Sequence, residues 1–241
     1  MKLIEKIKGR FNVNEGKQGA GLLAKKRKYV LIQIGEFMKI AKIPSGPLMV
    51  NSYLVWDEDS KKGFIVDPGG YNATMKDMIK DEEIDLEYII LTHGHMDHIG
   101  GVNEMRNVYG SKVVSSEDEV PMLEDPNYNM SIQFGNPVTV TPDITVTDGE
   151  TLQVGSATLH FIMTPGHSIG GMCIKLGDVL FSGDTLFEGS VGRTDFKGGD
   201  MNALVKSVHE KLFVLDDDTR VYPGHMGETT IGREKVYNPF V

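Results

Sequence analysis

One apolar run in the chain ends directly in a group of potential metal ligands. Residues 86–92 form a dense apolar segment, which is typical of a strand buried on both faces. The polar residues that follow it within six positions are His93, His95, Asp97 and His98. In extended backbone His93 and His95 point to the same side, because side chains alternate along a strand. Four potential ligands so close together suit two adjacent divalent ions better than one, since a tetrahedral ion needs only three protein ligands and a water.

Three later segments each place one more potential ligand just past a predicted strand and directly after a glycine. These residues are His167, Asp184 and His225. A lone Gly-His pair is usually a turn, but strands that share one open edge would bring all of these loops to one place. The sequence therefore predicts a metal site built from seven ligands, five His and two Asp: His93, His95, Asp97, His98, His167, Asp184 and His225.

Short apolar runs alternate with turn clusters from Met38 onward. Strands are predicted over residues 50–56, 63–67, 86–92, 112–115, 151–154, 157–164, 171–176, 179–182 and 220–222. Helices are predicted over residues 72–83, about 97–109 and 202–212. Residues 117–142 contain four prolines and little periodicity, which predicts a long surface loop. Two strand-rich halves that each carry helices predict an α+β fold with two sheets face to face and helices outside.

Composition excludes several other classes of protein. The net charge of −9 argues against binding nucleic acid through the general field of the molecule. The single cysteine, Cys173, excludes an intrachain disulfide and fits a reducing compartment. No window approaches the roughly 18 apolar residues of a membrane span. Charged residues interrupt the amino terminus where a signal peptide needs an unbroken apolar stretch, so we expect a cytoplasmic protein without a membrane partner.

Residues 1–37 differ in charge from the rest of the chain. They carry nine Lys or Arg and three Glu, a net charge of +6, whereas residues 38–241 carry −15. The basic run at residues 25–28 either contacts an anionic partner or is simply solvated. Codons for Gly35-Glu36 can also form a purine-rich ribosome-binding sequence before Met38. We therefore expect residues 1–37 to be an extension, non-native or disordered, with the natural start at Met38 and one functional domain over residues 38–241.

The order His-x-His-x-Asp-His, then His, Asp and His, resembles the metallo-β-lactamase superfamily over about residues 38–241. The resemblance implies an αββα four-layer sandwich. Residues 187–195, 230–235 and 238–240 are similar to the short glyoxalase II-like, or hydroxyacylglutathione hydrolase-like, proteins. By position, the resemblance implies a first ion held by His93, His95 and His167. It implies a second ion held by Asp97, His98 and His225, with Asp184 bridging both.

Departures from neighbouring families narrow the resemblance. The β-lactamases of this fold usually have a non-histidine after the motif aspartate and a later ligand cysteine, whereas His98 fills the first position and Cys173 lies outside every ligand segment. Diiron electron-transfer relatives replace the second histidine by Glu, and this chain has His95. Full-length glyoxalase II carries a carboxy-terminal helical portion that helps hold glutathione, and this sequence ends at Val241 without one. The resemblance therefore does not specify glutathione as the thiol carrier.

The ligand set predicts a chemistry. Two divalent ions, zinc first and iron or manganese as alternatives, would lower the pKa of a bridging water from about 15.7 toward neutrality. The resulting hydroxide would attack a carbonyl carbon, and Asp97 or Asp184 would take the proton afterwards. We expect hydrolysis of a small-molecule thioester, an S-acyl thiol, with a lactone or other ester second. The rival reading resembles persulfide dioxygenases, which share Gly-Arg-Thr-Asp at residues 192–195 and use a single iron. The acyl group, the thiol carrier and the oligomeric state are left open.

Four further polar residues are interpreted outside the ligand set. His160 lies inside a predicted strand and is interpreted as structural, and His209 as a partly solvated surface group. Asp67 ends a predicted strand, where it either orients a ligand histidine from behind or caps a turn. Arg193 either contacts an anionic substrate or forms an internal salt bridge.

Overall fold

Seven strands form the first sheet of the protein, which is described here by a computed structural model over residues 29–34 and 37–241. The strand order is β1 (Val30–Ile34), β2 (Met38–Ser45), β3 (Val50–Asp57), β4 (Lys62–Val66), β5 (Asp85–Ile90), β6 (Lys112–Ser116) and β7 (Ile144–Val146). Strands β1 to β4 pair in antiparallel fashion. Strands β4 to β7 are parallel neighbours, so the carboxyl ends of β4 and β5 lie at the same edge.

The second sheet has six strands. Its order is β15 (Thr229–Thr230), β14 (Arg220–Pro223), β11 (Val179–Gly183), β10 (Met172–Leu176), β9 (Ala157–Met163) and β8 (Thr151–Val154). β11 and β14 are parallel. β9 and β11 also run in one direction, because both are antiparallel to β10. A small hairpin of β12 (Leu186–Phe187) and β13 (Ser190–Val191) follows β11.

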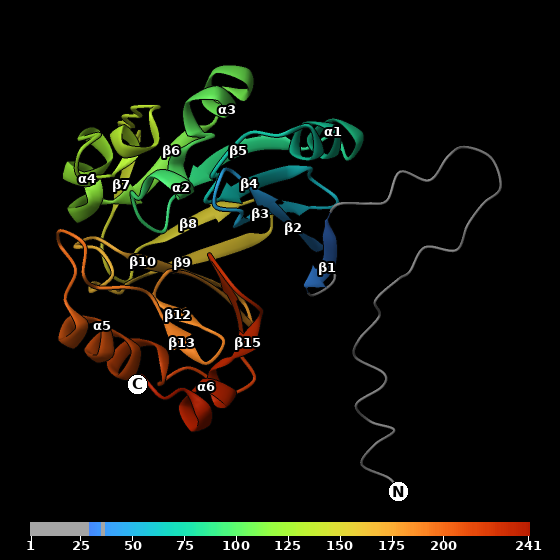
Figure 1. Ribbon diagram of the computed structural model, residues 1–241. Helices are drawn as coiled ribbons and strands as arrows, with labels where there is room; N and C mark the ends of the chain where they lie inside the picture. Colours follow the sequence, from blue (N-terminus) through green and yellow to red (C-terminus); the bar gives the residue numbers. More distant parts are fainter. Residues whose placement is uncertain (1–28, 35–36) are drawn as a thin grey trace, which may run out of the picture.

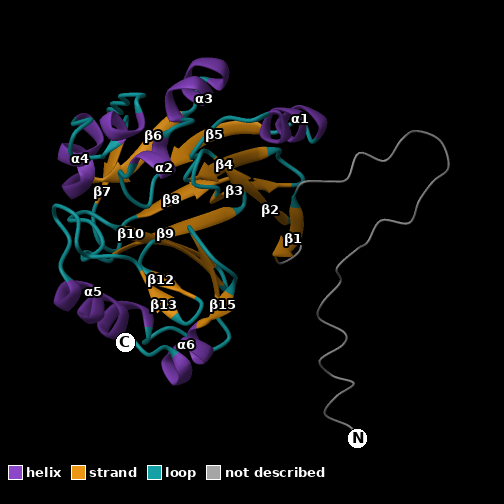
Figure 2. Ribbon diagram, viewed as in Figure 1, coloured by secondary structure: helices purple, strands orange, loops and turns teal. Residues whose placement is uncertain are grey.

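Helices cover the outer faces of the two sheets, as Figures 1 and 2 show. On the first sheet lie α1 (Ala73–Asp81), α2 (Met96–Ile99), α3 (Val102–Tyr109) and α4 (Val120–Glu124), with 3-10 turns η1 (Glu117–Glu119) and η2 (Ser131–Phe134). On the second lie α5 (Met201–Ser207), which continues as the π-helical turn η3 (Val208–Leu212), and α6 (Ile231–Tyr237). The predicted αββα sandwich is confirmed.

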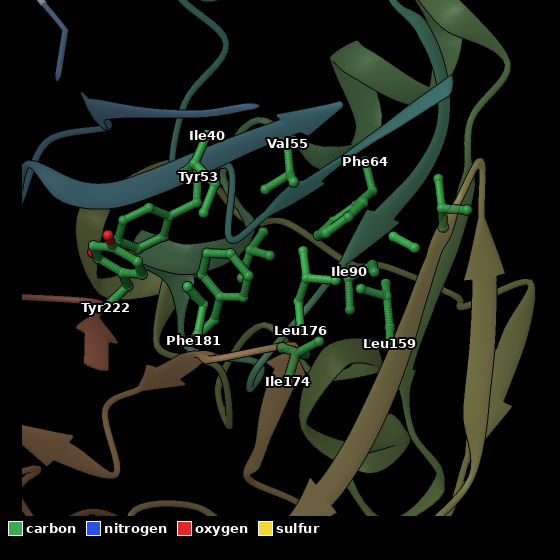
Figure 3. Packing of buried hydrophobic residues seen from close by; sticks show 14 of the residues in the cluster. Ile40, Tyr53, Val55, Phe64, Ile90, Leu159, Ile174, Leu176, Phe181 and Tyr222 are labelled. Carbon is green, nitrogen blue, oxygen red and sulfur yellow. The ribbon is translucent and has the colours of Figure 1, made fainter. Parts of the chain in front are cut away.

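Three apolar clusters separate these four layers. The central cluster joins the two sheets, and its aromatic members Tyr53, Phe64, Phe181 and Tyr222 meet there (Figure 3). A second cluster packs the first sheet against α1 and α3, and a third packs the second sheet against η3 and α6. The middle strands of both sheets therefore bury both faces, which explains their continuous apolar runs, whereas β9 exposes Thr158 and His160 on its outer side. Cys173 lies in the third cluster, where burial raises its pKa to about 11.

Two predicted elements are wrong. The helix expected over residues 97–109 is broken into α2 and α3 at Gly100 and Gly101. A Cβ at Gly101 would lie 2.7 Å from the backbone nitrogen of Tyr71, and one at Gly100 would collide with the carbonyl of Gly69. The chain turns there because it passes directly against another backbone segment. Residues 117–142, expected as a surface loop, contain η1, α4 and η2, and they bury Met122 and Leu123 in the sandwich.

The other predicted strands and helices are present within about two residues of their expected ends. Asn72 caps α1, as its position suggested, by accepting a hydrogen bond from the Met75 amide at 3.1 Å. Strand β1 pairs along β2, whereas the rest of the proposed extension, residues 1–28 and 35–36, lies outside the described residues. Within the described part of the chain, no helix is long and apolar enough to cross a membrane.

Phe181 offers a direct test of the central packing. Its ring centroid lies 5.2 Å from that of Tyr53 and 6.4 Å from that of Phe64. We expect Phe181→Ala to lower the free energy of unfolding by about 3–5 kcal/mol, because the cavity forms between two rigid sheets. Urea unfolding measures this change. Val236→Ala on α6, where the side chain is 69% exposed, is the control and should stay within about 0.5 kcal/mol.

Candidate metal centre

Three histidine side chains face one another where β5 and β9 end. The Nε2 atom of His167 lies 2.9 Å from Nδ1 of His95 and 3.2 Å from Nε2 of His93. All three side chains are buried. Ligand nitrogens around a tetrahedral zinc ion lie about 3.3 Å apart, given Zn–N bonds of about 2.0 Å. The three nitrogens therefore have the spacing of one metal site, the first ligand group.

Hydrogen bonds behind two of these rings decide which nitrogen carries the proton. His167 donates its Nδ1 proton to the carbonyl oxygen of Arg193, at 2.6 Å. The Thr92 hydroxyl donates to Oδ2 of Asp67 at 2.6 Å, so it can only accept from Nδ1 of His93, 3.1 Å away. Both imidazoles consequently present an unprotonated Nε2 to the centre of the group. This is the tautomer that a metal ligand needs.

A second ligand group lies beside the first. Nε2 of His225 is 3.0 Å from Oδ2 of Asp97, and Nε2 of His98 is 3.7 Å from the same oxygen. Behind His98, its Nδ1 contacts Oδ2 of Asp67 at 2.9 Å. The forward-facing Nε2 of His98 is buried and has no hydrogen-bond partner. Such an orphaned polar atom is costly unless something compensates it, and a bound cation would do so.

Asp184 lies between the two groups. Its Oδ1 is 3.5 Å from Nε2 of His98, and its Oδ2 is 3.7 Å from Nε2 of His167 and 3.8 Å from Nε2 of His225. The Oδ1 atom is also buried without a hydrogen-bond partner. One carboxylate thus faces ligands of both groups: Oδ1 faces His98 of the second group, and Oδ2 faces one ligand of each group. The donor set, histidine nitrogens and carboxylates around orphaned atoms, fits two divalent ions that share Asp184.

The two groups differ in their electrostatics. Burial and the neighbouring histidines lower the pKa of His93 well below its usual value and that of His95 to about 3. Burial also disfavours the charged form of His98, but Asp97, Asp184 and Asp67 outweigh it and raise the pKa of His98 to about 10. Burial opposes ionisation of Asp97, yet the adjacent His98 and His225 hold the pKa of that carboxyl below its usual range. His93 and His95 of the first group are therefore neutral, whereas the second group gathers carboxylates that favour a cation.

Glycines let these loops approach closely. Gly183, before Asp184, has φ +50°, and a Cβ on it would collide with the Thr92 side chain. A Cβ on Gly224 would lie 2.5 Å from Oδ1 of Asp184 and 2.6 Å from Cε1 of His98. The glycine before each ligand in the sequence thus has a steric reason, since there is no room for a side chain.

Of the two interpretations of Asp67, the structure supports the one in which it orients a ligand histidine. Besides His98, it accepts hydrogen bonds from the amide and the hydroxyl of Thr92, at 2.8 and 2.6 Å. Its backbone lies in the left-handed region, with φ 49°, a strained conformation of the kind that clusters at functional sites. Through Thr92 and His98, one buried carboxylate supports both ligand groups.

The remaining polar residues are less central. Arg193 forms a salt bridge with Asp195, with nitrogen–oxygen distances of 2.9 and 2.7 Å. Of its two interpretations, the internal salt bridge is the one that the structure shows. His160 and His209 are exposed.

Two residues that support the candidate site were not predicted from the sequence. Asn51 donates to the carbonyls of Pro223 and Met226 on either side of His225, and Glu119 contacts the loops of the first group. A single polar residue gives no periodic signal that would reveal either role.

Comparisons with known proteins agree with this geometry. Residues 45–225 match the family model described as the metallo-beta-lactamase superfamily. The chain belongs to the metallo-β-lactamase superfamily. It is similar to the probable metallo-hydrolase YqgX of Bacillus subtilis, at 37% identity over 85% of this chain and 98% of the relative. It is also similar to the hydroxyacylglutathione hydrolase GloC of Haemophilus influenzae, at 35% identity over 85% of this chain and 98% of the relative.

Solved structures of the superfamily are similar over the same region. BLEG-1, described as a B3 metallo-beta-lactamase, has a TM-score of 0.78 and 39% identity over 84% of this chain and 98% of its own. TTHA1623 in a di-iron-bound form has a TM-score of 0.74 and 31% identity over 83% of this chain and 99% of its own. ETHE1 from Myxococcus xanthus has a TM-score of 0.66 and 28% identity over 88% of this chain and 83% of its own. With the gathered ligand groups, these likenesses make the chain a metal-dependent hydrolase of this superfamily.

Replacing Asp67 tests the support behind the ligands. In Asp67→Asn an NH₂ group replaces one acceptor oxygen, so the side chain can no longer accept from the Thr92 amide at Oδ1 and also from the Thr92 hydroxyl and His98 at Oδ2. We expect divalent metal affinity to fall about 10–100-fold, the usual effect of losing an outer partner of a ligand histidine. Competition with a chromophoric chelator measures this affinity, and unchanged binding would contradict the role given to Asp67.

Gly224 tests the steric requirement. Gly224→Ala places a methyl group against Asp184 and His98, so we expect the second metal to be lost before the first. Metal analysis after dialysis should give about one ion per chain in place of two. Gly177→Ala is the control for an added methyl group: Gly177 has φ +55°, so alanine is strained there, but its Cβ would meet nothing within 4 Å and the metal content should not change.

Proposed function

We propose that this chain is a binuclear metal-dependent hydrolase that cleaves a thioester, an S-acyl thiol. The first ion would be held by His93, His95 and His167. The second would be held by Asp97, His98 and His225, with Asp184 shared. The observation that carries the proposal is the position of Asp184, whose carboxylate lies within 4 Å of ligand nitrogens of both groups. A shared carboxylate is expected of two-ion hydrolytic sites, in which the ions lie about 3.5–4 Å apart.

The chemistry follows from the groups in place. Divalent ions bound here would make water a nucleophile near neutral pH and polarise the substrate carbonyl. Asp97 and Asp184 are the carboxylates closest to the reacting centre, so one of them takes the proton released after attack. Cys173 cannot act as the nucleophile, because it is buried in the cluster behind the second sheet.

The substrate class draws support from the relatives. GloC, at 35% identity, is described as a hydroxyacylglutathione hydrolase, and hydroxyacyl-glutathione is a thioester. BLEG-1, described as a B3 metallo-beta-lactamase, is similar enough that a β-lactam amide belongs in the same assay panel. The di-iron form of TTHA1623 supports iron beside zinc as a metal to be tested. A lactone or other ester is the alternative substrate of the same chemistry.

The second candidate is a persulfide dioxygenase with one iron, suggested by Gly192-Arg193-Thr194-Asp195. Such an enzyme leaves second-site residues unfilled. In this chain Asp97, His98 and His225 form a group whose ligand atoms lie within 4.8 Å of one another. The two candidates therefore differ in whether this second group holds an ion.

One experiment separates these candidates. Protein of measured metal content is assayed with thioesters, lactones and a β-lactam, and oxygen consumption is followed with a persulfide. The hydrolase proposal predicts two ions per chain and thioester turnover without oxygen uptake. One iron per chain together with oxygen uptake would refute it.

Asp184→Ala tests the shared ligand. We expect metal content to fall below one ion per chain and turnover to fall by more than about 100-fold, since even the outer partners of metal ligands change activity by 10–100-fold. Asp81→Ala at the exposed end of α1 is the matched control. Thioester turnover that survives in Asp184→Ala would exclude this mechanism.

A further inference from the structure

Glu119 is a buried carboxylate outside the ligand groups. It ends η1, in the segment that the sequence predicted to be a surface loop, and it is only 1% exposed. Among the described residues no Lys, Arg or His lies within ion-pair distance of it. A buried carboxylate without a cation is costly unless hydrogen bonds satisfy its oxygens. Its partners therefore show what it holds.

All three of its side-chain partners lie in loops that carry ligands of the first group. Oε1 accepts a hydrogen bond from the Gly94 amide at 2.8 Å. Oε2 accepts from the Gly170 amide at 2.7 Å and from the Ser168 hydroxyl at 3.0 Å. Gly94 stands between His93 and His95, and Ser168 directly follows His167. Each oxygen thus binds a different loop.

The packing around Glu119 leaves these loops little freedom. A Cβ on Gly170 would collide with the Glu119 amide, so this loop runs directly against η1. The Ser116 hydroxyl donates to the carbonyl of Gly170 and adds a second tie to the same turn. On the other side, a Cβ on Gly94 would lie 3.1 Å from Met122 and 3.2 Å from Leu123, which are buried residues of α4. Glu119 is therefore fixed between two loops that are themselves fixed.

From this arrangement we infer that Glu119 is a positioning residue for the first metal site. Its carboxylate sets the separation between the His93–His95 loop and the His167 loop. The nitrogens that must converge, Nδ1 of His95 and Nε2 of His167, lie 2.9 Å apart across these two loops. The inference rests on the metal-binding part of the proposed function and is independent of the substrate.

Glu119→Gln removes the hydrogen bonds to one of the two loops with almost no change in side-chain volume. The amide oxygen can accept from one loop, but the amide nitrogen then faces an N–H donor of the other. We expect Zn²⁺ affinity at the first site to fall about 10–100-fold, with a smaller effect on the second site. The readout is competition between the protein and a chromophoric chelator for Zn²⁺, measured without substrate, so it does not depend on which bond the enzyme cleaves.

Asp57→Asn is the matched control. Asp57 is also buried, at 3% exposed, and accepts hydrogen bonds from the amides of Asp59, Ser60 and Ser156 and from the Ser156 hydroxyl. It lies at the carboxyl end of β3, whereas Asn51 at the other end contacts the His225 loop. We expect Asp57→Asn to lower Tm and to leave Zn²⁺ affinity unchanged.

A purely structural role for Glu119 would give a different result. Glu119→Gln would then lower Tm as Asp57→Asn does and bind Zn²⁺ with wild-type affinity, and that result overturns the inference. If Glu119→Gln does not fold, Ser168→Ala replaces it, because this change removes one donor and leaves the carboxylate in place. Loss of one hydrogen bond of about 1 kcal/mol predicts about a fivefold weaker first site. Wild-type affinity in Ser168→Ala would likewise overturn the inference.

Discussion

The structure depends on bringing seven candidate ligand side chains, most of them buried, to within a few ångströms of one another. Imidazole nitrogens and carboxylate oxygens lose hydration there, and two of these atoms, Nε2 of His98 and Oδ1 of Asp184, have no hydrogen-bond partner. Such desolvation is unfavourable unless a cation compensates it. The loops can hold these side chains close together because each loop begins at the end of a strand in a rigid sandwich. β4, β5, β9, β11 and β14 all lead into one edge, and apolar clusters pack the two sheets against each other and against their outer helices.

Two buried carboxylates, Asp67 and Glu119, hold the candidate ligands in place through hydrogen bonds. Asp67 fixes His98 directly and His93 through the Thr92 hydroxyl. Glu119 ties the His93–His95 loop to the His167 loop through backbone amides. Neither carboxylate is proposed to bind metal. Both act on ligand geometry, which decides metal affinity because small displacements of the ligand nitrogens weaken a tetrahedral site.

Much of this centre was predictable from the sequence, for a physical reason. A buried strand, then a glycine or a short turn, then His or Asp is a local pattern, and it recurs where strands end at the site. Roles that depend on distant contacts were harder to predict. Asp67 had two interpretations because only the fold shows that His98 lies 2.9 Å away. The break at Gly100 depends on the nearby backbone of Gly69. Glu119 lies in a proline-containing segment whose short helices have no amphipathic period, so its burial left no trace in the pattern.

The most direct test of a two-ion centre is a crystal structure of the metal-loaded protein with data collected at the absorption edge of the bound metal. Anomalous difference density should show two peaks. One should lie among His93, His95 and His167 and the other among Asp97, His98 and His225, with an oxygen of Asp184 beside each. A single peak at the first group, in fully loaded protein with Asp184 turned away from the second, would contradict the shared-carboxylate centre on which the proposed hydrolysis rests.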